Sequence, residues 1–542
     1  MFRFIFVTAL SAVLCACGGG AATSSPTPSV SVPDTPSVDT PVGGDETLPD
    51  PLLPAVEPGP EPPSAVVAPG NPAKPNLVLI MTDDQTVRDL AAMPWTLKLL
   101  RNEGVAFTNS FVSWPLCCPS RATAFSGVYA HNHGVLGNYP PDGAAQAFTT
   151  DSETLPVWLQ RAGYATIHIG KYLNGYGADR RGSTYVPPGW TDWMGLVDPT
   201  TYRMWGYKLN HNGVLTTYGD ESVEDPKLYQ TDVLTKLALD AIDRAAATGN
   251  PFFLSFAPLA PHEEIPENPP PGTFFPGPRP APRHAGSLSW VPLPQVLGFD
   301  ESDLSDKPAI IPALGALWNR ETMANRVSRY QRRLEALRAV DEAVWWIMVK
   351  LKVMGALDNT WIVFTSDNGW FNGEHHLDLG KYLMYEPSIR VPLLVRGPGV
   401  IPGTLSSELV ANVDLAATFV DLAGATPGRV IDGRSLVPFI HDPNLVTTRP
   451  ILLDAPHDQL VSPGANPTDI PAMRGLRTRR FKYVEYGTGE VELYDLVSDP
   501  GEMNSRHADP NYAAARTALH TLLQQYQGCV GDTCRAGIIP PN

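Results

Sequence analysis

The stretch Asn76–Thr82, with the sequence NLVLIMT, decides the fold. A nearly continuous apolar run of this length is typical of a strand buried on both faces of a parallel sheet. Similar runs recur at Phe252–Phe256, Trp361–Thr365 and Ile451–Asp454. Helical patterns lie between these runs, and alternating strands and helices predict an α/β fold with a mainly parallel sheet.

Two of the intervening helices are indicated by their spacing and their ends. Leu155–Arg161 is followed by Gly163, a suitable C-terminal cap, and the long amphipathic segment Tyr330–Leu351 is closed by Gly355. Pro266–Pro282 is rich in proline. We expect it to be a surface excursion and a candidate wall of a substrate cleft.

The pattern changes in the last part of the chain. Arg480–Tyr486 and Val491–Leu496, separated by a turn that contains glycine, predict an antiparallel hairpin. A final helix is predicted over Tyr512–Tyr526. Cys529 and Cys534 follow it, and in an exported protein they are expected to close a small disulfide loop.

The N-terminus has the composition of a targeting segment. Arg3 precedes the apolar run Phe4–Leu14, which is too short to span a bilayer and fits the core of a signal peptide. The run leads into LCAC at 14–17, which resembles a bacterial lipobox with Cys17 as the lipidated first residue. We therefore expect a lipoprotein signal peptide over 1–16 and a lipid anchor at a bacterial cell surface, periplasmic or extracellular. Ordinary secretion with cleavage nearby is the alternative.

The segment 17–73 and the overall charge restrict the class of protein further. Residues 18–73 are mostly Gly, Ser, Thr, Val and Pro, with seven acidic residues and no Lys or Arg, so a disordered tether is predicted over 17–73. The net charge of -16 argues against nucleic acid as a partner. Six cysteines among 542 residues also exclude a disulfide scaffold.

The strongest functional signal is CCPSR at 117–121, followed by ATAFSG at 122–127. The pattern Cys-x-Pro-Ser-Arg resembles the signature of the type I sulfatases, whose fold is alkaline-phosphatase-like. The resemblance implies that Cys117 is oxidised to formylglycine, an aldehyde, by a formylglycine-generating maturation enzyme. A pair of buried cysteines at a helix start is the alternative interpretation.

Acidic and amide side chains follow two of the predicted strands. DDQ at 83–85 follows the first strand, and SDNG at 366–369 follows the strand near 361–365. Asp-Asp at a strand end is also common in turns and helix caps. Three carboxylates and an amide nevertheless suit Ca²⁺ or Mg²⁺. The resemblance assigns Asp83, Asp84, Asp367 and Asn368 as metal ligands, with the modified Cys117 completing the shell and Ca²⁺ as the commoner ion.

The resemblance also implies a set of cationic side chains that contact sulfate. Lys171 lies in HIGKY, His262 in APH and Lys381 in LGK, and Arg121 belongs to the signature itself. One position departs from the family pattern. Many sulfatases have a histidine two residues after the first of these lysines, where this chain has Leu173. Which residue takes over that role stays open, and Asn174 is not assigned to it.

Several motifs resemble the branch of N-acetylglucosamine-6-sulfatases and heparan endosulfatases. They are the doubled cysteine, AHNH at 130–133 and GKYLN at 170–174. RVPLLVRGPG at 390–399 and ELYDL at 492–496 are also similar to sulfatase sequences. The resemblance extends from Lys74 to about Asn504, which places a catalytic domain over 74–445 and a C-terminal subdomain over 446–542.

The chemistry implied by the resemblance is hydrolysis of a sulfate monoester, on a sulfated sugar or an aryl sulfate. The aldehyde hydrates to a gem-diol, one hydroxyl attacks sulfur, and the second allows sulfate to leave. Lys381 or His262 is the expected general acid. Trp205, Tyr207 and Trp370 are candidate surfaces for stacking on a sugar, with ordinary packing as the alternative.

Three other functions remain open at this point. The chain is also compatible with an arylsulfatase, with a phosphate or phosphonate ester hydrolase on the same scaffold, and with a non-catalytic lipoprotein that binds sulfated glycans. The resemblance does not decide the substrate, exo or endo action, or the oligomeric state.

Overall fold

The computed structural model describes residues 74–265, 275–316, 321–377, 380–456 and 470–537. The expected signal peptide, Cys17 and the tether lie outside the described residues, as does most of the proline-rich segment 266–282. Among the described helices, none combines the length and the apolar character that crossing a bilayer requires.

The core of the described chain is a ten-stranded sheet in the order β10-β2-β9-β8-β1-β7-β3-β4-β5-β6. Strand β1, Asn76–Thr82, lies between β8 (Thr360–Ser366) and β7 (Phe252–Ala257), and both neighbours run parallel to it. Strand β3, Ala165–Gly170, continues the parallel part beyond β7. The expected α/β fold with a mainly parallel sheet is confirmed. The other strands are β2 Val105–Phe111, β4 Asp192–Leu196, β5 Tyr207–His211, β6 Val214–Tyr218, β9 Leu393–Arg396 and β10 Thr404–Ala411.

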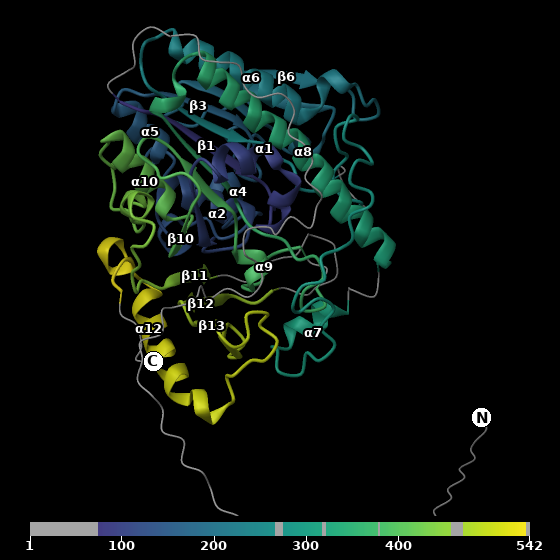
Figure 1. Cartoon of the computed structure of the whole chain (residues 1–542), viewed down its shortest axis with the longest axis vertical. Helices are drawn as coiled ribbons and strands as arrows, with labels where there is room; N and C mark the ends of the chain where they lie inside the picture. The colour runs from purple at the N-terminus through teal and green to yellow at the C-terminus, as the bar shows by residue number, and fades with distance from the viewer. Residues whose placement is uncertain (1–73, 266–274, 317–320, 378–379, 457–469, 538–542) are drawn as a thin grey trace, which may run out of the picture. The chain divides into compact units, whose positions relative to one another are not determined.

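Helices cover both faces of this sheet, which explains why β1 has no polar side. Leu77 and Leu79 belong to the same apolar cluster as residues of α5 (Leu155–Arg161) and α10 (Asp414–Ala423). Val78 and Ile80 pack instead with residues of α6 and α8, the long pair that crosses the sheet in Figure 1. The remaining helices are α1 Pro94–Thr96, α2 Cys117–Ser126, α3 Ala130–His133, α4 Ala144–Ala147, α6 Gln230–Ala246, α7 Ile310–Gly315, α8 Met323–Val353, α9 Glu386–Ile389, α11 Val437–His441 and α12 Ala513–Tyr526.

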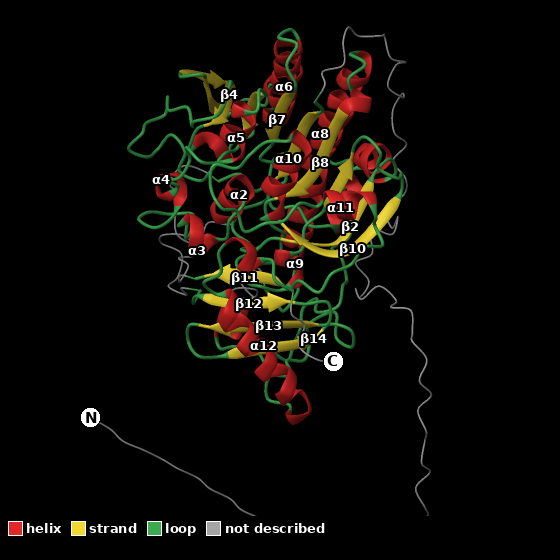
Figure 2. Ribbon diagram, turned by 90° about the vertical axis from the view of Figure 1, so that its left-hand side faces the viewer, coloured by secondary structure: helices red, strands yellow, loops and turns green. Residues whose placement is uncertain are grey.

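A separate four-stranded antiparallel sheet follows near the end of the chain, with α12 beside it (Figure 2). Its strands are β11 Ile451–Ala455, β12 Met473–Arg477, β13 Phe481–Tyr486 and β14 Val491–Asp495. The predicted hairpin is therefore confirmed. The placement of Ile451–Asp454 among the parallel strands was wrong. Every residue of β11 is buried, and a fully buried strand has the same apolar sequence pattern in a parallel or an antiparallel sheet.

The predicted helices exist, and the largest boundary difference is at the start of α8. Helix α5 coincides with the expected range, whereas α8 begins at Met323, one residue after a Thr322 cap that accepts a hydrogen bond from the Asn325 backbone. The first turns of α8 are largely polar, and therefore the apolar spacing became visible only from Tyr330 onward.

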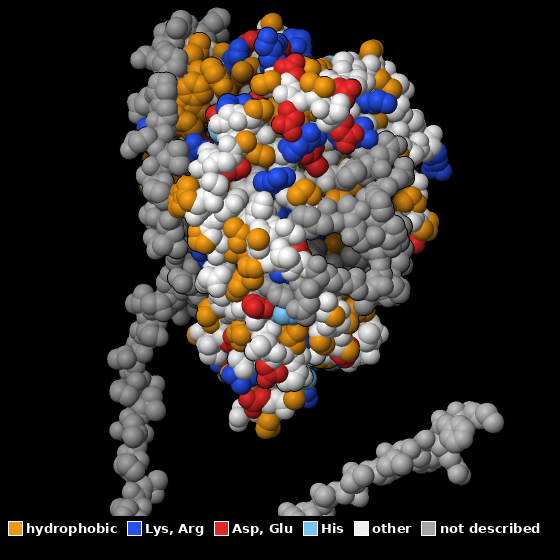
Figure 3. Space-filling model, turned by 90° about the vertical axis from the view of Figure 1, so that its right-hand side faces the viewer, with side chains coloured by type: hydrophobic (Ala, Val, Ile, Leu, Met, Phe, Trp, Pro, Cys, Tyr) orange, Lys and Arg blue, Asp and Glu red, His pale blue; other side chains and the backbone are white. Residues whose placement is uncertain are grey.

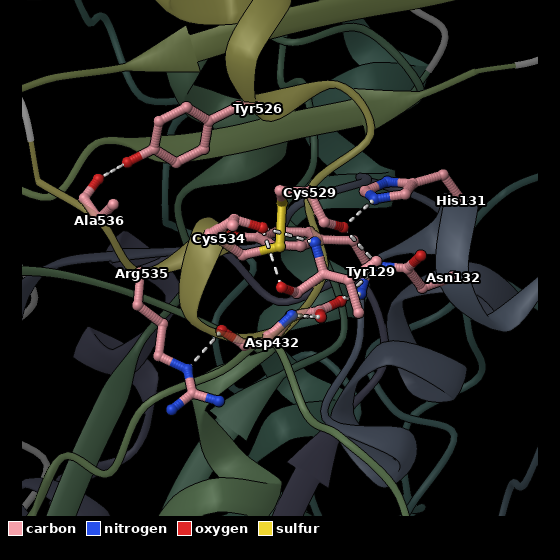
Figure 4. Close-up of a disulfide and its surroundings, with 12 residues drawn as sticks. Tyr129, His131, Asn132, Asp432, Tyr526, Cys529, Cys534, Arg535 and Ala536 are labelled. Atoms are coloured by element: carbon pink, nitrogen blue, oxygen red, sulfur yellow. Dashed lines mark hydrogen bonds between the residues drawn. A yellow bond between two sulfur atoms is a disulfide. The ribbon is translucent and has the colours of Figure 1, made fainter.

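The expected disulfide between Cys529 and Cys534 is present, and its loop is docked on helix α3 (Figure 4). The Cys529 carbonyl is 3.0 Å from His131 Nε2 and accepts a hydrogen bond of 2.8 Å from Asn132 Nδ2. Asp432 accepts from the Gly531 backbone at 2.7 Å. The AHNH motif thus anchors the end of the chain beside α2.

Candidate active site

The acidic motifs meet at the carboxyl ends of two adjacent strands. Thr82 of β1 pairs in register with Ser366 of β8, so the residues that follow each strand are neighbours. The Asp84 backbone donates to Asp367 Oδ1 at 3.1 Å, and Asn368 Nδ2 donates to Asp84 Oδ1 at 2.6 Å. All four acidic and amide side chains after these strands are completely buried.

The two cysteines at the start of α2 face different surroundings. Cys117 Sγ lies 3.5 Å from Asp83 Oδ1 and accepts a hydrogen bond of 2.8 Å from Lys381 Nζ. Cys118 packs instead in the apolar cluster beneath the sheet, while its backbone N–H is bound by Asn138. The extended conformation of Leu116 ends the incoming loop and turns the first residue of the helix toward the acidic cluster. Of these two thiols, only that of Cys117 is therefore within hydrogen-bonding distance of charged side chains in the described part of the chain.

Buried cations surround the carboxylates. Lys171, directly after β3, forms an ion pair with Asp83, and Lys381 forms one with Asp84. Arg121, one turn along α2 from Cys117, reaches Asp367 at 2.7 Å and Asp83 at 3.3 Å. These groups come from five separate places in the sequence, namely 83–84, 121, 171, 367 and 381, and the folded chain brings them into one centre.

His262 completes the centre from the loop after β7. Its Nε2 lies 3.6 Å from Asp84 Oδ2, and its Nδ1 lies 2.8 Å from the Glu263 carbonyl. One donor atom from each of Asp83, Asp84, Cys117 and His262 falls within 4.8 Å of the others, close enough to share a metal ion. The sequence predicts a metal shell made of oxygen ligands and a contact between His262 and the sulfate. The His262 imidazole lies close enough to the acidic cluster to be a metal ligand as well as a contact for sulfate.

Burial and charge set the protonation states of the centre. Burial, together with the negative charge of Asp83, raises the pKa of the Cys117 thiol to about 12, so unmodified Cys117 is a neutral thiol at neutral pH. Burial opposes the charge of Lys381, but Asp84 and the other negative groups of the centre together outweigh it and hold the pKa of the lysine well above its ordinary value. Burial lowers the pKa of His262 despite the nearby Asp84. Lys381 is thus a cation, while His262 tends to be neutral.

Some polar atoms of the centre are left without a partner. Among the described residues, Asn368 Oδ1 is buried and accepts no hydrogen bond, and Asp84 Oδ2 has only the distant His262 imidazole beside it. Buried acceptors of this kind are costly unless something binds them. The oxygen donors of Asp83, Asp84, Asp367 and Asn368 therefore fit a hard divalent cation.

The structure adds two residues that carried no sequence signal. Arg333 of α8 is buried, donates to the Asp84 and Pro261 carbonyls and lies over the Trp370 ring at 4.4 Å. Tyr202 lies beside both Lys171 and His262. Neither belongs to a recognisable motif, since one is in a long amphipathic helix and the other in a short 3₁₀ turn.

The other aromatic candidates are accounted for by packing. Trp205 is buried against Tyr229, and Tyr207 is buried and stacks on Tyr218. Trp370 is largely buried beneath the Arg333 guanidinium. Leu173, which stands where a histidine was expected, is buried in the apolar core and contributes no polar group to the centre.

The outer surface differs from this concentrated centre. On the face shown in Figure 3, Lys and Arg side chains alternate with Asp and Glu side chains over the upper part of the molecule. The cations that could hold an anionic substrate, Arg121, Lys171 and Lys381, are by contrast buried near the strand ends, where the surrounding protein strengthens their electrostatic effect.

Comparison with known proteins gives concordant results. The sequence profile described as Sulfatase matches residues 75–425, and that described as N-sulphoglucosamine sulphohydrolase, C-terminal, matches residues 373–528. The chain is 34% identical over 513 residues to an arylsulfatase of Volvox carteri, covering 87% of this chain and 77% of that protein. It is 31% identical over 504 residues to N-acetylglucosamine-6-sulfatase of Homo sapiens, covering 86% and 87%.

The fold is also similar to solved structures. A protein solved in complex with its substrate D-glucosamine-2-N,6-O-disulfate superposes with a TM-score of 0.69 at 23% identity, covering 85% of this chain and 98% of that one. At this level of identity the likeness concerns the fold.

Proposed function

Because the chain belongs to the sulfatase family, we propose that it removes sulfate from sulfated sugars by means of a formylglycine formed from Cys117. The observation that carries this proposal is the position of Cys117 at the start of α2, in contact with Asp83 and Lys381 and apart from the apolar packing of Cys118. A maturation enzyme that generates formylglycine is the implied partner.

A divalent metal, Ca²⁺ or Mg²⁺, is part of the proposal. Asp83, Asp84, Asp367 and Asn368 would hold it, together with the modified residue 117, and the unpartnered oxygens of Asp84 and Asn368 support this assignment. When bound, the metal supplies positive charge that lowers the pKa of a hydroxyl nucleophile and stabilises the sulfate oxygens.

The modification answers a specific chemical need. A buried thiol with a pKa of about 12 is protonated at neutral pH and is a poor nucleophile. The aldehyde, as its hydrate, supplies one hydroxyl to attack sulfur and a second whose deprotonation releases sulfate. An unmodified cysteine or a serine lacks the second hydroxyl.

The chain's own side chains bind the substrate and move the proton. Lys171 and Arg121 bring fixed positive charge to the sulfate position, next to the carboxylates that orient them. Cleavage of the S–O bond leaves electrons on the sugar oxygen, which must take up a proton. Lys381 or His262, both beside residue 117 and Asp84, is the group that donates it.

A sugar substrate is favoured over a simple aryl sulfate by the relatives that resemble this chain. The similarity to human N-acetylglucosamine-6-sulfatase extends over both halves of the described chain. The second profile, described for an N-sulphoglucosamine sulphohydrolase, covers the C-terminal region. An arylsulfatase relative of similar identity makes an aryl substrate the competing candidate.

The experiment compares one enzyme on four esters. Matured protein is assayed on 6-O-sulfated N-acetylglucosamine, a sulfated disaccharide, nitrophenyl sulfate and nitrophenyl phosphate. We expect the highest kcat/KM on a sulfated sugar and the lowest on the phosphate ester. A higher kcat/KM on nitrophenyl sulfate than on every sugar would contradict the proposed substrate. Preferred cleavage of the phosphate ester would identify a phosphatase on this scaffold, and binding of sulfated glycans without turnover would identify a non-catalytic protein.

Export and anchoring are proposed on the sequence alone. The apolar run 4–14 and LCAC at 14–17 support a lipoprotein signal with Cys17 as the acylated residue, and 17–73 supports a tether. The protein would then act at a bacterial cell surface.

A further inference from the structure

Tyr202 occupies a position between two of the proposed substrate-binding groups. Its ring centroid is 4.9 Å from Lys171 Nζ and 5.1 Å from the centroid of the His262 ring. The Tyr202 carbonyl accepts a hydrogen bond of 3.1 Å from the Ile265 backbone, which ties its turn to the loop that carries His262. The ring is thus fixed beside the reacting centre.

In the part of the chain that the structure describes, the hydroxyl of Tyr202 is oriented by one hydrogen bond, from Asn174. Asn174 Nδ2 donates a hydrogen bond of 2.7 Å to it, so the phenol oxygen is used as an acceptor. Among the described residues, no acceptor takes the phenol proton, and Asn174 Oδ1 is buried without a partner. The pair therefore retains one free donor and one free acceptor.

Asn174 is itself held in place by the fold. It lies three residues after Lys171, is 9% exposed, and its carbonyl accepts a hydrogen bond of 2.7 Å from the Ala145 backbone. Burial raises the pKa of Tyr202 well above its ordinary value, so the hydroxyl keeps its proton. A protonated phenol with a fixed acceptor contact can donate in only a narrow range of directions.

Tyr202 also lines a cavity of about 320 Å³, a volume at the lower end of the range for small-molecule sites. Two further lining residues, Glu264 and Arg279, are paired with each other at 2.7 Å.

From these contacts we propose that Tyr202, held by Asn174, contacts the sugar part of the substrate and selects sulfated sugars over aryl sulfates. The phenol donates to a sugar hydroxyl or ring substituent, and Asn174 Oδ1 accepts from a neighbouring hydroxyl or amide N–H. A nitrophenyl group has no donor for Asn174 and lies flat where the sugar substituents would be. This inference rests on the proposed function. It names the residues that would recognise the sugar, which is the leaving group of the proposed reaction.

The test is a double-mutant cycle of Tyr202→Phe and Asn174→Ala, measured on 6-O-sulfated N-acetylglucosamine and on nitrophenyl sulfate. Tyr202→Phe keeps the ring against Lys171 and His262 and removes only the hydroxyl. We expect kcat/KM for the sugar to fall about tenfold, the effect of one lost hydrogen bond, and that for nitrophenyl sulfate to change less than about twofold. The double variant should lose little more than the larger single loss, because the two residues act together.

Tyr207→Phe is the matched control, since Tyr207 is a buried tyrosine in another cluster, stacked on Tyr218. It should leave the ratio of the two kcat/KM values unchanged. The peptide containing residue 117 is weighed in every variant, so that incomplete maturation is not mistaken for lost recognition. Equal losses on both substrates in Tyr202→Phe would overturn this inference alone. A wild-type enzyme that cleaves no sulfated sugar would overturn the proposed substrate and this inference with it.

Discussion

The protein buries charge in two places, and the difference between them separates function from structure. The active centre gathers Asp83, Asp84 and Asp367 with three cations at the ends of β1 and β8. The second place, which we term the subdomain network, consists of Glu386, Arg477, Lys482, Glu492 and Glu502 around the small sheet. Buried charge alone thus does not identify a site.

The two regions differ in what remains unsatisfied. In the subdomain network, Glu492 accepts hydrogen bonds from the hydroxyls of Tyr385, Tyr486 and Tyr494, at 2.5 to 2.6 Å, and Lys482 pairs with Glu502. In the active centre, Asn368 Oδ1 has no partner among the described residues. In the network, the buried Glu502 Oε1 makes no hydrogen bond but is neutralised by its ion pair with Lys482, whereas Asn368 Oδ1 in the centre has no such ion pair and remains available to something that the described chain does not supply.

The largest expected effect is on the acidic cluster. Asp84→Asn should lower kcat/KM by at least about a hundredfold, because it removes a proposed metal ligand and the carboxylate paired with Lys381. Chelation of the wild-type enzyme should abolish turnover, and Ca²⁺ or Mg²⁺ should restore it. Metal analysis of both proteins provides a second readout. Full activity in Asp84→Asn, or in Asp367→Ala, would remove the metal site from the account.

The next prediction tests whether Lys381 and His262 donate a proton to the leaving group or only bind the sulfate. A sugar alkoxide is a poorer leaving group than a phenoxide and depends more on a general acid. Lys381→Ala or His262→Ala should therefore lower kcat/KM by about a hundredfold on a sugar sulfate and far less on nitrophenyl sulfate. Parallel assays of the two substrates measure the ratio. Identical losses on both would show that these residues only hold the sulfate.

A smaller effect is expected in the subdomain network, and on a different quantity. Glu492→Gln replaces an acceptor of three tyrosine hydroxyls by an amide that can accept at only one of its two positions. The free energy of unfolding should fall by about 1–3 kcal/mol, while kcat/KM stays unchanged. Thermal unfolding and assays of the same preparation test this. Glu103→Gln, at an exposed position, serves as the control; a loss of activity at native stability in Glu492→Gln would erase the distinction between the two regions.

The smallest effect is expected from the N-terminal segment. Removal of residues 1–73 should leave kcat/KM for a soluble substrate within about twofold, since this segment has only the composition of a signal and a tether. In a bacterial host, palmitate labelling of the full chain should depend on Cys17. Labelling that persists in Cys17→Ala would refute the lipoprotein interpretation.

The sequence was informative where chemistry follows a strand directly. DDQ after β1 and SDNG after β8 were predictable neighbours, because parallel strands place their carboxyl ends at one edge. The motif was sufficient to predict that Cys117, and not Cys118, is the modified residue. The physical reason is visible only in the structure: Cys117 faces charged side chains, whereas Cys118 faces the apolar core. A sequence pattern therefore predicts a site residue reliably when it fixes both where the residue lies in the fold and which way its side chain faces.

Residues that act through tertiary contact escaped sequence reasoning. Tyr202 is in a three-residue turn, and the sequence around it does not predict its contacts with Lys171 and His262. Residue type alone marks Trp205 and Tyr207 as candidate stacking surfaces, and both are buried in packing. The run at β11 could not be assigned to a sheet, since burial on both faces hides the direction of pairing.

The central claim is that this sulfatase works through residue 117, and one measurement tests it most directly. Protein made together with a formylglycine-generating enzyme is digested, and the peptide that contains Cys117 and Cys118 is fragmented in a mass spectrometer, beside an assay on a sulfated sugar. We expect residue 117 to have lost its sulfur and two hydrogens and gained an oxygen, with activity in proportion to the converted fraction. Full activity with both thiols intact, or conversion at Cys118 only, would contradict the account.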